Sequence, residues 1–397
     1  MAKPVATRLG DVVNFKRGYD LPESTRRTGP FPVISSGGFS GYHDEYKVAG
    51  EGVVTGRYGT LGEMHYYDGK YWPHNTALYV TDFKGNFPKY VYYLLSCLGR
   101  MDTGDKSTVP GVNRNDLHEL KIPVIKDKKA QKTIAAVLSI LDAKIELNNR
   151  INAKLEALAK TIYDYWFVQF DFPDAKGCPY KTSGGKMVWN ETLKREIPTR
   201  WGAGSLDDLG QIVGGSTPST LNPEHFGKDM IPWITPKDLS NNKGNKFIAR
   251  GESDVSEAGK RSASLTLYPA GTVLMSSRAP VGYLAIALNP VTTNQGFKSF
   301  VPSKGYGTSF VYYAVQRSLP TIIQYASGST FVEISAGVLK SVHAVLPVKA
   351  VVDAFCRQIE QIVQRQQIAE LENTELTQLR DWLLPLLMNG QVKPADM

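Results

Sequence analysis

The segment Lys89-Tyr-Val-Tyr-Tyr-Leu-Leu-Ser96 returns as Ser309-Phe-Val-Tyr-Tyr-Ala-Val-Gln316, 220 residues further along the chain. Upstream of each copy a second pair of segments matches, Phe31-Pro-Val-Ile-Ser35 and Ile231-Pro-Trp-Ile-Thr235. A period of this length is too long for a solenoid, whose units contain tens of residues. The repeat therefore predicts two tandem globular domains.

The repeat continues through shorter motifs and is interrupted in one stretch, residues 236–270. There the offset between the halves grows from 200 to about 220, which gives the second half about twenty extra residues. The matching positions elsewhere are residues 59–62 with 279–282, Asn75 with Asn294, residues 107–108 with 329–330, and residues 123–124 with 347–348.

Two long helices are predicted by apolar residues with three-and-four spacing. The first runs from Gln131 to Trp166 without proline or glycine, and Asp127 is placed to cap its start. At 1.5 Å per residue it is roughly 54 Å long. The second runs from Val351 to Leu387, at a constant offset of 221 from the first. The stripe residues are Leu138, Leu141, Ile145, Asn148, Asn152, Leu155 and Ile162 in the first helix, and Ile359, Ile362, Gln366, Asn373, Leu376 and Leu383 in the second.

A narrow stripe sustained over about four heptads is typical of a helix that pairs with another helix. We expect the two helices to pair with each other as a coiled coil, with the buried Asn and Gln side chains setting the register. The alternative is that each helix packs on the core of its own domain.

These patterns place the chain in the α+β class and divide it into five parts. A first β-rich domain (1–126) is expected to contain a short helix at Tyr90–Leu98 and an exit strand at Leu120–Ile125. A connector between the first long helix and the second domain is rich in Pro, Gly, Lys and Ser and is expected to be extended. The remaining parts are the first long helix (127–167), the connector (168–203), the second β-rich domain (204–348), and the second long helix with its tail (349–397).

Composition favours a globular protein with a polyanionic partner. Of the 397 residues 42% are apolar and 21% charged, which excludes a disordered chain. The net charge of +8 favours nucleic acid, because Lys and Arg near phosphates release condensed counterions. No segment has the length of a membrane span, and the amino terminus lacks an apolar signal core, so we expect a cytoplasmic protein.

The sequence contains no recognisable catalytic motif. It has no phosphate-binding GxxxxGK[ST] loop, and its three cysteines and six histidines lack metal-ligand spacing. Asp171, Asp174 and Lys176 could be read as a nuclease-like acidic cluster, but they lie in the connector, where surface charge is the ordinary explanation. Asn222-Pro-Glu-His-Phe226 resembles the Asn-Pro-Pro-Tyr motif of amino-methyltransferases only in part, and we interpret it as a turn. We therefore expect no catalytic residue and no metal site.

Loop residues that recur at matched positions in both halves favour DNA binding. Arg and Asn suit bidentate contacts to guanine and adenine edges, whereas Ser, Thr and Lys suit phosphate contacts. For a single residue a solvated turn is an equally good explanation. The candidate DNA-binding residues are Arg57, Tyr58, Thr60, Lys106, Ser107, Thr108, Asn113, Arg114, Lys260, Arg261, Arg278, Asn294, Gln295, Ser329 and Thr330.

Several stretches resemble the specificity (S) subunit of type I restriction–modification enzymes. The helix Gln131–Asn149, continuing to Tyr165-Trp-Phe167, is similar to the central helix of that family. Ser183-Gly-Gly-Lys-Met187 with Ile197-Pro-Thr-Arg-Trp201 is similar to its entry into the second recognition domain. The end of its distal helix resembles Leu379-Arg-Asp-Trp-Leu-Leu-Pro-Leu-Leu-Met-Asn-Gly390.

The resemblance implies two target-recognition domains that each read one half of a bipartite double-stranded DNA sequence. The two helices would lie antiparallel as a spacer, with pseudo-two-fold symmetry. Two methyltransferase (M) subunits would supply S-adenosylmethionine and adenine methylation, and two restriction (R) subunits would supply chemistry that depends on ATP and Mg²⁺. This chain itself would bind no cofactor and would be non-catalytic.

Under this interpretation the framework around Tyr92-Tyr93 and Tyr312-Tyr313 meets a common partner twice, whereas the basic stretch 236–270 faces DNA. One alternative is a duplicated coiled-coil scaffold for proteins without specific DNA binding. Another is a self-contained nuclease or methyltransferase. The basic and amide residues of the stretch are Lys237, Asn241, Asn242, Lys243, Lys246, Arg250, Lys260 and Arg261.

Overall fold

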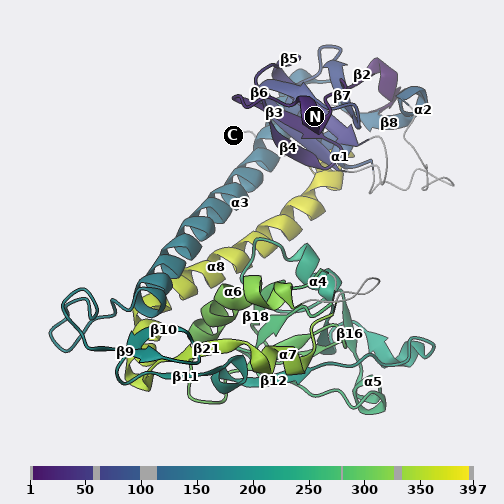
Figure 1. Ribbon diagram of the computed structural model, residues 1–397. Helices are drawn as coiled ribbons and strands as arrows, with labels where there is room; N and C mark the ends of the chain where they lie inside the picture. Colours follow the sequence, from purple (N-terminus) through teal and green to yellow (C-terminus); the bar gives the residue numbers. More distant parts are fainter. Residues whose placement is uncertain (1–2, 57–62, 99–113, 279, 326–332, 393–397) are drawn as a thin grey trace. The chain divides into compact units, whose positions relative to one another are not determined.

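The computed structural model describes residues 3–56, 63–98, 114–278, 280–325 and 333–392 (Figure 1). The chain forms two compact units, and the division falls within the two long helices. Unit 1 comprises Met1–Glu146 with Asn373–Met397, and unit 2 comprises Leu147–Glu372. Among the described helices none combines the length and the apolar character needed to cross a membrane.

Unit 1 is built on a six-stranded sheet in the order β2-β7-β5-β6-β3-β4. Strand β3 runs parallel to β6, and the other neighbouring strands are antiparallel. Its strands are β2 (Asn14–Arg17), β3 (Phe31–Ser35), β4 (Gly38–His43), β5 (Val48–Gly56), β6 (Met64–Pro73) and β7 (Ala77–Asp82).

Shorter elements complete unit 1. Helix α1 (Pro88–Ser96) is the predicted short helix; it packs against β5 and β6 because five of its nine side chains are apolar or aromatic and buried. Strand β8 (Lys121–Val124), the predicted exit strand, pairs with β1 (Val5–Arg8). The others are η1 (Leu9–Asp11), η2 (Glu23–Thr25) and α2 (Arg114–Glu119).

Unit 2 repeats this plan. Its five-stranded sheet has the order β12-β20-β17-β18-β15, in which the first four strands correspond to β2-β7-β5-β6 of unit 1. Helix α6 (Thr308–Gln324) packs on β17 and β18, as α1 does on β5 and β6. The strands are β12 (Gln211–Gly214), β15 (Phe247–Ile248), β17 (Val273–Met275), β18 (Leu284–Ala287) and β20 (Lys298–Val301), and β11 (Gly202–Ser205) pairs with β21 (His343–Leu346).

Single hydrogen bonds confirm the internal repeat. His74 N donates to Ile34 O at 2.8 Å, and Asn294 N donates to Ile234 O at 3.1 Å. The same offsets, 200 and 220, were expected from the sequence. By these hydrogen bonds Asn294 corresponds to His74, one residue before the predicted counterpart, Asn75. After β6 and β19 the backbone positions of the two units therefore match at a different offset from the asparagine side chains.

The extra stretch 236–270 adds elements that unit 1 lacks at this point of the repeat. Strand β15 joins the sheet beside β18 in parallel, and β16 (Ser253–Val255) pairs with β13 (Phe226–Gly227) and β14 (Ile231–Ile234). Strand β14 also pairs with β19 (Thr292–Thr293). The remaining elements are η4 (Leu206–Leu209), η5 (Pro223–His225), α4 (Pro236–Asn241), α5 (Glu257–Ser262) and α7 (Ala336–Ser341).

The connector is folded, which corrects the expectation of an extended segment. Strands β9 (Met187–Asn190) and β10 (Arg195–Pro198) form a hairpin, and the rings of Phe172 and Trp201 stack at a centroid distance of 5.0 Å. Both rings lie in the core of unit 2. The sequence shows no periodicity here because its core contacts come from isolated aromatic residues.

Both long helices are present. Helix α3 (Lys128–Tyr163) begins beside Asp127, whose Oδ1 accepts a hydrogen bond from Lys129 N at 3.0 Å, and it continues into a π-helical turn, η3 (Asp164–Val168). Helix α8 (Lys349–Met388) contains Pro385. In unit 1 the α3 residue Leu138 shares a core with the α8 residue Leu387, and in unit 2 Ala159 of α3 shares a core with Ile359 of α8.

The predicted stripe residues face inward to different extents. Five are buried, and the others are partly buried. Polar residues connect the helices: Arg380 Nη1 donates to Asp142 Oδ1 at 2.9 Å in unit 1, and Asn148 Nδ2 donates to Glu372 Oε2 at 2.8 Å in unit 2. The buried residues are Leu138, Asn148, Asn152, Ile359 and Gln366; the partly buried ones are Leu141, Ile145, Leu155, Ile162, Ile362, Asn373, Leu376 and Leu383.

The repeated Tyr-Tyr pairs are largely internal, which corrects the expectation that they meet an external partner. Tyr93 and Tyr313 are 2% and 1% exposed, and Tyr312 is also buried. Tyr93 OH donates to Asp142 Oδ2 at 2.5 Å, and Tyr313 OH donates to Glu156 Oε2 at 3.0 Å. The motif repeats because in each unit it packs α1 or α6 against the long helices.

Candidate nucleic-acid interface

In each unit a glycine directly follows the first sheet strand, β2 or β12. There the chain comes close to the end of a strand of the parallel pair, β6 in unit 1 and β19 in unit 2. Tyr19 N donates to Pro73 O at 2.8 Å, and Ser216 N donates to Thr293 O at 3.0 Å. A Cβ on the preceding residue would lie 2.1 Å from a carbonyl oxygen, that of His74 for Gly18 and that of Thr293 for Gly215. Only glycine permits this approach, which fixes the loop end in both units.

In unit 2 this approach brings together three of the predicted DNA-binding residues. Ser277 N donates to Gly296 O at 2.8 Å, so Arg278 lies beside the loop that carries Asn294 and Gln295. Asn294 Oδ1 accepts from Gly296 N at 2.9 Å, which leaves its amide group oriented by its own loop. Thr217 Oγ1 donates to Gln295 Oε1.

The charge of this group is mixed. The guanidinium of Arg278 is exposed, and its Nε lies 3.2 Å from Glu333 Oε2. Lys298 Nζ lies 3.9 Å from the other oxygen of the same carboxylate. Two cations therefore share one anion, and the group keeps a positive charge that suits a phosphate.

In unit 1 the equivalent place holds residues that the sequence analysis missed. Arg17, at the end of β2, is exposed, and its Nε donates to Asn75 O at 3.3 Å. Asn75 Nδ2 donates to Asp20 Oδ1. Arg17 in unit 1 and Thr217 in unit 2 escaped notice because they precede the matched motifs, although Gly18 and Gly215 mark the place.

Other predicted residues lie elsewhere or outside the described residues. Arg114 is exposed at the start of α2, and Lys260 and Arg261 lie on α5, where Lys260 Nζ is 3.7 Å from Glu257 Oε2. The predictions for all these residues stay predictions. Those outside the described residues are Arg57, Tyr58, Thr60, Lys106, Ser107, Thr108, Asn113, Ser329 and Thr330.

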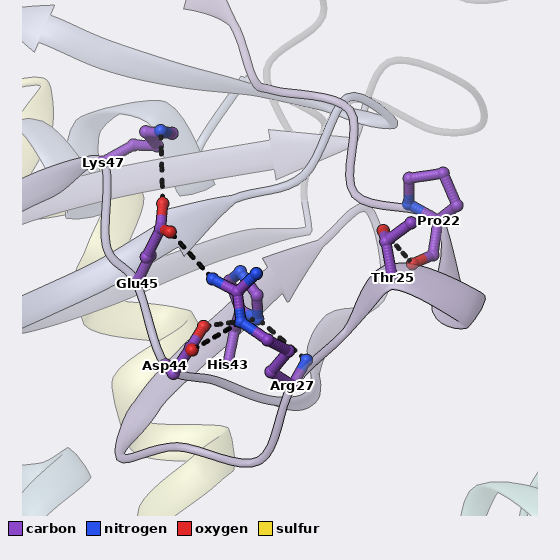
Figure 2. Close-up of polar contacts among 7 residues, drawn as sticks. All are labelled: Pro22, Thr25, Arg27, His43, Asp44, Glu45 and Lys47. Atoms are coloured by element: carbon purple, nitrogen blue, oxygen red, sulfur yellow. Dashed lines mark hydrogen bonds and ion pairs between the residues drawn. The ribbon is translucent and has the colours of Figure 1, made fainter.

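Arg27 illustrates a cation with an internal role. Figure 2 shows its guanidinium against two carboxylates, with Nε 2.6 Å from Asp44 Oδ2 and Nη2 2.8 Å from Glu45 Oε1. The hydrogen bond from Arg27 lowers the pKa of Asp44. The backbone N of Arg27 donates to His43 Nδ1 at 3.2 Å. These contacts close the segment before β3 onto the β4–β5 connection, so Arg27 adds little net charge to the surface.

The basic stretch 236–270 does not present all its cations to solvent, which corrects one expectation. Lys246 is 4% exposed and lies inside unit 2. Lys237 Nζ lies 2.7 Å from Glu252 Oε2, and Arg250 Nη1 bonds Asp254 Oδ2. Burial and pairing with nearby acids are invisible in composition, so the stretch is less cationic at its surface than its sequence indicates.

The remaining motifs have local roles. Asp174 Oδ1 accepts from Lys176 N and Cys178 N within one turn, and Asp171 accepts from Thr182. Asn222 caps η5 by accepting from Glu224 N, which confirms the turn. Across the described ranges, no group of three or more His, Cys, Asp or Glu side chains has an arrangement that could hold a metal ion.

Comparison with known proteins gives consistent matches. The family model described as "Type I restriction modification DNA specificity domain" matches residues 5–157 and 198–378. The MjaIX specificity subunit of a type I restriction enzyme of Methanocaldococcus jannaschii is 38% identical over 214 residues, which cover 50% of this chain and 48% of that protein. The HindI specificity subunit of Haemophilus influenzae is 28% identical over 336 residues, 72% of each chain.

A solved structure supports the fold. The crystal structure of the S subunit of a type I restriction–modification system from M. genitalium matches 99% of this chain and 96% of that chain, with a TM-score of 0.56 and 16% identity. Two tandem β-rich domains that each lead into a long helix are thus a known arrangement. The match to the M. jannaschii protein spans about half of that protein's length.

Proposed function

Because this chain belongs to the family of type I restriction–modification DNA specificity domains, we propose that it is the non-catalytic DNA-recognition subunit of a type I restriction–modification complex. The observation that carries the proposal is the repeated sheet end. In each unit the same backbone approach, made at Gly18 or Gly215, holds a loop of polar residues that are at least partly exposed, residues 74–76 and 294–295. Two such ends suit a DNA target of two half-sites, one read by each unit.

Helices α3 and α8 would be the spacer, paired as an antiparallel coiled coil. Within unit 2 the partner of Asn148 is Glu372, and the partner of Asn152 is Gln366. The position on α8 thus falls as the position on α3 rises, which supports an antiparallel pairing. These polar contacts between the helices would fix the register of the coiled coil at some cost in stability.

Repeated apolar residues on the outer faces of these helices support two copies of one protein partner. Leu147 and Ile368 stand at the offset of 221 and are 47% and 56% exposed. Leu158 and Leu379, at the same offset, are also exposed. We assign these positions to two methyltransferase (M) subunits. Restriction (R) subunits would join the same complex.

The chemistry would come from these partners. S-adenosylmethionine, ATP and Mg²⁺ would bind there, and the methyltransferase would act on an adenine that has left the base stack. The chain would bind double-stranded DNA without a cofactor of its own, in the cytoplasm.

The test is to co-express the chain with the methyltransferase subunit and map methylated adenines across a genome. One bipartite sequence with a fixed gap is the expected result. Methylation without a common sequence, or none with an assembled complex, would refute the proposal.

The second candidate is a duplicated protein scaffold whose basic charge is incidental, and the exposed apolar pairs are compatible with it. Salt distinguishes the two functions. DNA affinity of the assembled complex should fall steeply as salt rises, because phosphate contacts release counterions. Affinity that does not change with salt would favour the scaffold.

A further inference from the structure

A buried ammonium group in unit 2 joins the inserted stretch to both long helices. Lys246 Nζ lies 2.5 Å from Glu156 Oε2 of α3, and it donates to Gln366 Oε1 of α8 at 2.9 Å. It also donates to Tyr313 OH at 2.5 Å. The three N–H groups of the ammonium thus have three acceptors, which is the full capacity of a lysine.

The backbone of the same stretch is held by a second carboxylate. Glu370 of α8 accepts from Lys246 N through Oε1 and from Phe247 N through Oε2, each at 2.9 Å. Lys246 O in turn accepts from Ile286 N of β18 at 2.8 Å. The start of β15 is therefore fixed on one side to the helix and on the other to the sheet.

Two further groups of this cluster donate to the carboxylate of Glu156. Tyr313 OH and Gln366 Nε2 both donate to Glu156 Oε2, each at 3.0 Å. Burial opposes the ionisation of Glu156, but its pairing with Lys246 brings its pKa below the ordinary value. A buried charge pair contributes little net stability, whereas removal of one partner leaves the other uncompensated. Such a pair is suited to fixing one geometry.

Unit 1 has a related cluster of hydrogen-bonded side chains, in which the positive charge comes from a different element. Tyr93, the repeat counterpart of Tyr313, donates to Asp142 of α3, and Arg380 of α8 donates to the same carboxylate at 2.9 Å. In unit 2 the cation comes instead from the recognition domain itself. The inserted stretch is thereby tied directly to the helix pair.

We propose that Lys246 is a positioning residue, which sets the inserted stretch of unit 2 on helices α3 and α8 and so fixes how the second half-site is read. This inference rests on the proposed function. Lys246 touches no DNA in this scheme; it acts through β15 and the loops that the inserted stretch carries.

The test uses the complex of the full chain with its methyltransferase subunit. Lys246→Met removes the cation, and the double variant Lys246→Met with Glu156→Gln also removes the charge of its partner carboxylate, so that neither member of the pair is left uncompensated. Lys228→Met is the matched control, because Lys228 is an exposed lysine of unit 2 that lies outside the inserted stretch. Lys246→Arg restores the charge.

Two readouts are needed, methylation at sequences with single changes in either half-site and hydrogen exchange of the amides of Lys246 and Phe247. In both Met variants discrimination at the second half-site should fall at least tenfold, and amide exchange should rise at least tenfold. Discrimination at the first half-site should stay the same. Lys228→Met should behave as wild type, and Lys246→Arg should recover much of the loss.

Equal losses at both half-sites, or a folded double variant with unchanged discrimination and exchange, would overturn the inference. If the wild-type complex shows no bipartite methylation, the proposed function fails. The exchange measurement then still decides whether Lys246 holds β15, so the two failures are distinguishable.

Discussion

Two glycines define the geometry of the candidate interface at the residue scale. Gly18 and Gly215 lie at the same place in the two units, and a Cβ at either would lie 2.1 Å from a backbone oxygen. Backbone cannot move aside as the end of a flexible side chain can. The repeat of this constraint, without a repeat of the neighbouring side chains, separates a fixed framework from variable loops.

Gly215→Ala is expected to lower the stability of unit 2 by about 1–3 kcal/mol, because the chain must shift to admit the methyl group. Gly214→Ala is the matched control: its Cβ would meet no atom closer than 3.7 Å. Urea unfolding of the two variants checks this. Equal midpoints would show that the loop can move without cost.

Glu370 predicts a pH dependence. Burial raises its pKa from 4.5 to about 7, and the two backbone donors oppose the shift. Since the folded pKa is above the unfolded one, the native state holds more protons between these values. The free energy of unfolding therefore falls as the pH rises from about 4.5 to about 7, by up to about 3 kcal/mol from this group.

Urea midpoints of wild type and Glu370→Gln, measured at about pH 5 and pH 8, check the effect. The wild type should lose more stability than the variant between the two pH values. Parallel pH profiles would show that Glu370 ionises in the folded chain as it does in water.

At the scale of elements, periodic segments were predicted well and irregular ones were not. The helices over residues 128–163 and 349–388 begin and end within three residues of their predicted bounds, because their apolar spacing is local information. The hairpin β9–β10 was missed. Its stability depends on rings such as Phe172 and Trp201, whose partners are distant in sequence.

Asn152 tests the role of the polar contacts between the helices. Its Oδ1 is buried and has no hydrogen-bond partner among the described residues, and its Nδ2 donates to Gln366 O at 3.5 Å. Asn152→Leu should therefore stabilise the chain by about 1 kcal/mol while weakening the preference for one register.

Thermal melting of the purified chain checks the first effect. Asn148→Leu is the matched control and should destabilise, because it removes the 2.8 Å bond to Glu372. A lower melting temperature for Asn152→Leu would contradict the argument.

At the scale of the whole molecule, the two-domain plan predicts independent half-sites. Replacing residues 1–126 by the corresponding domain of another family member should change one half of the methylated sequence. Methylation mapping of the hybrid complex checks this. A change in both halves of the methylated sequence would show that the two domains do not each read one half-site.

The spacer role predicts a change in the gap. Four residues inserted after Asn149, with four more at the facing turn of α8 near Glu372, add about 6 Å to each helix. The methylated half-sites should then lie further apart, with their own sequences unchanged. The same insertion placed in α3 alone is the control, since it breaks the pairing and should lower assembly. An unchanged gap would remove the spacer role.

The sequence alone determined the duplication, the two long helices, the extra stretch in the second half and the family resemblance, because these follow from repeats and local periodicity. Only the tertiary structure decided what the shared features do. It turned Tyr93 and Tyr313 inward, against carboxylates of α3, and it buried Lys246 among residues far apart in sequence. Burial and ion pairing arise between segments that the fold brings together, so composition could not show which cations remain for DNA.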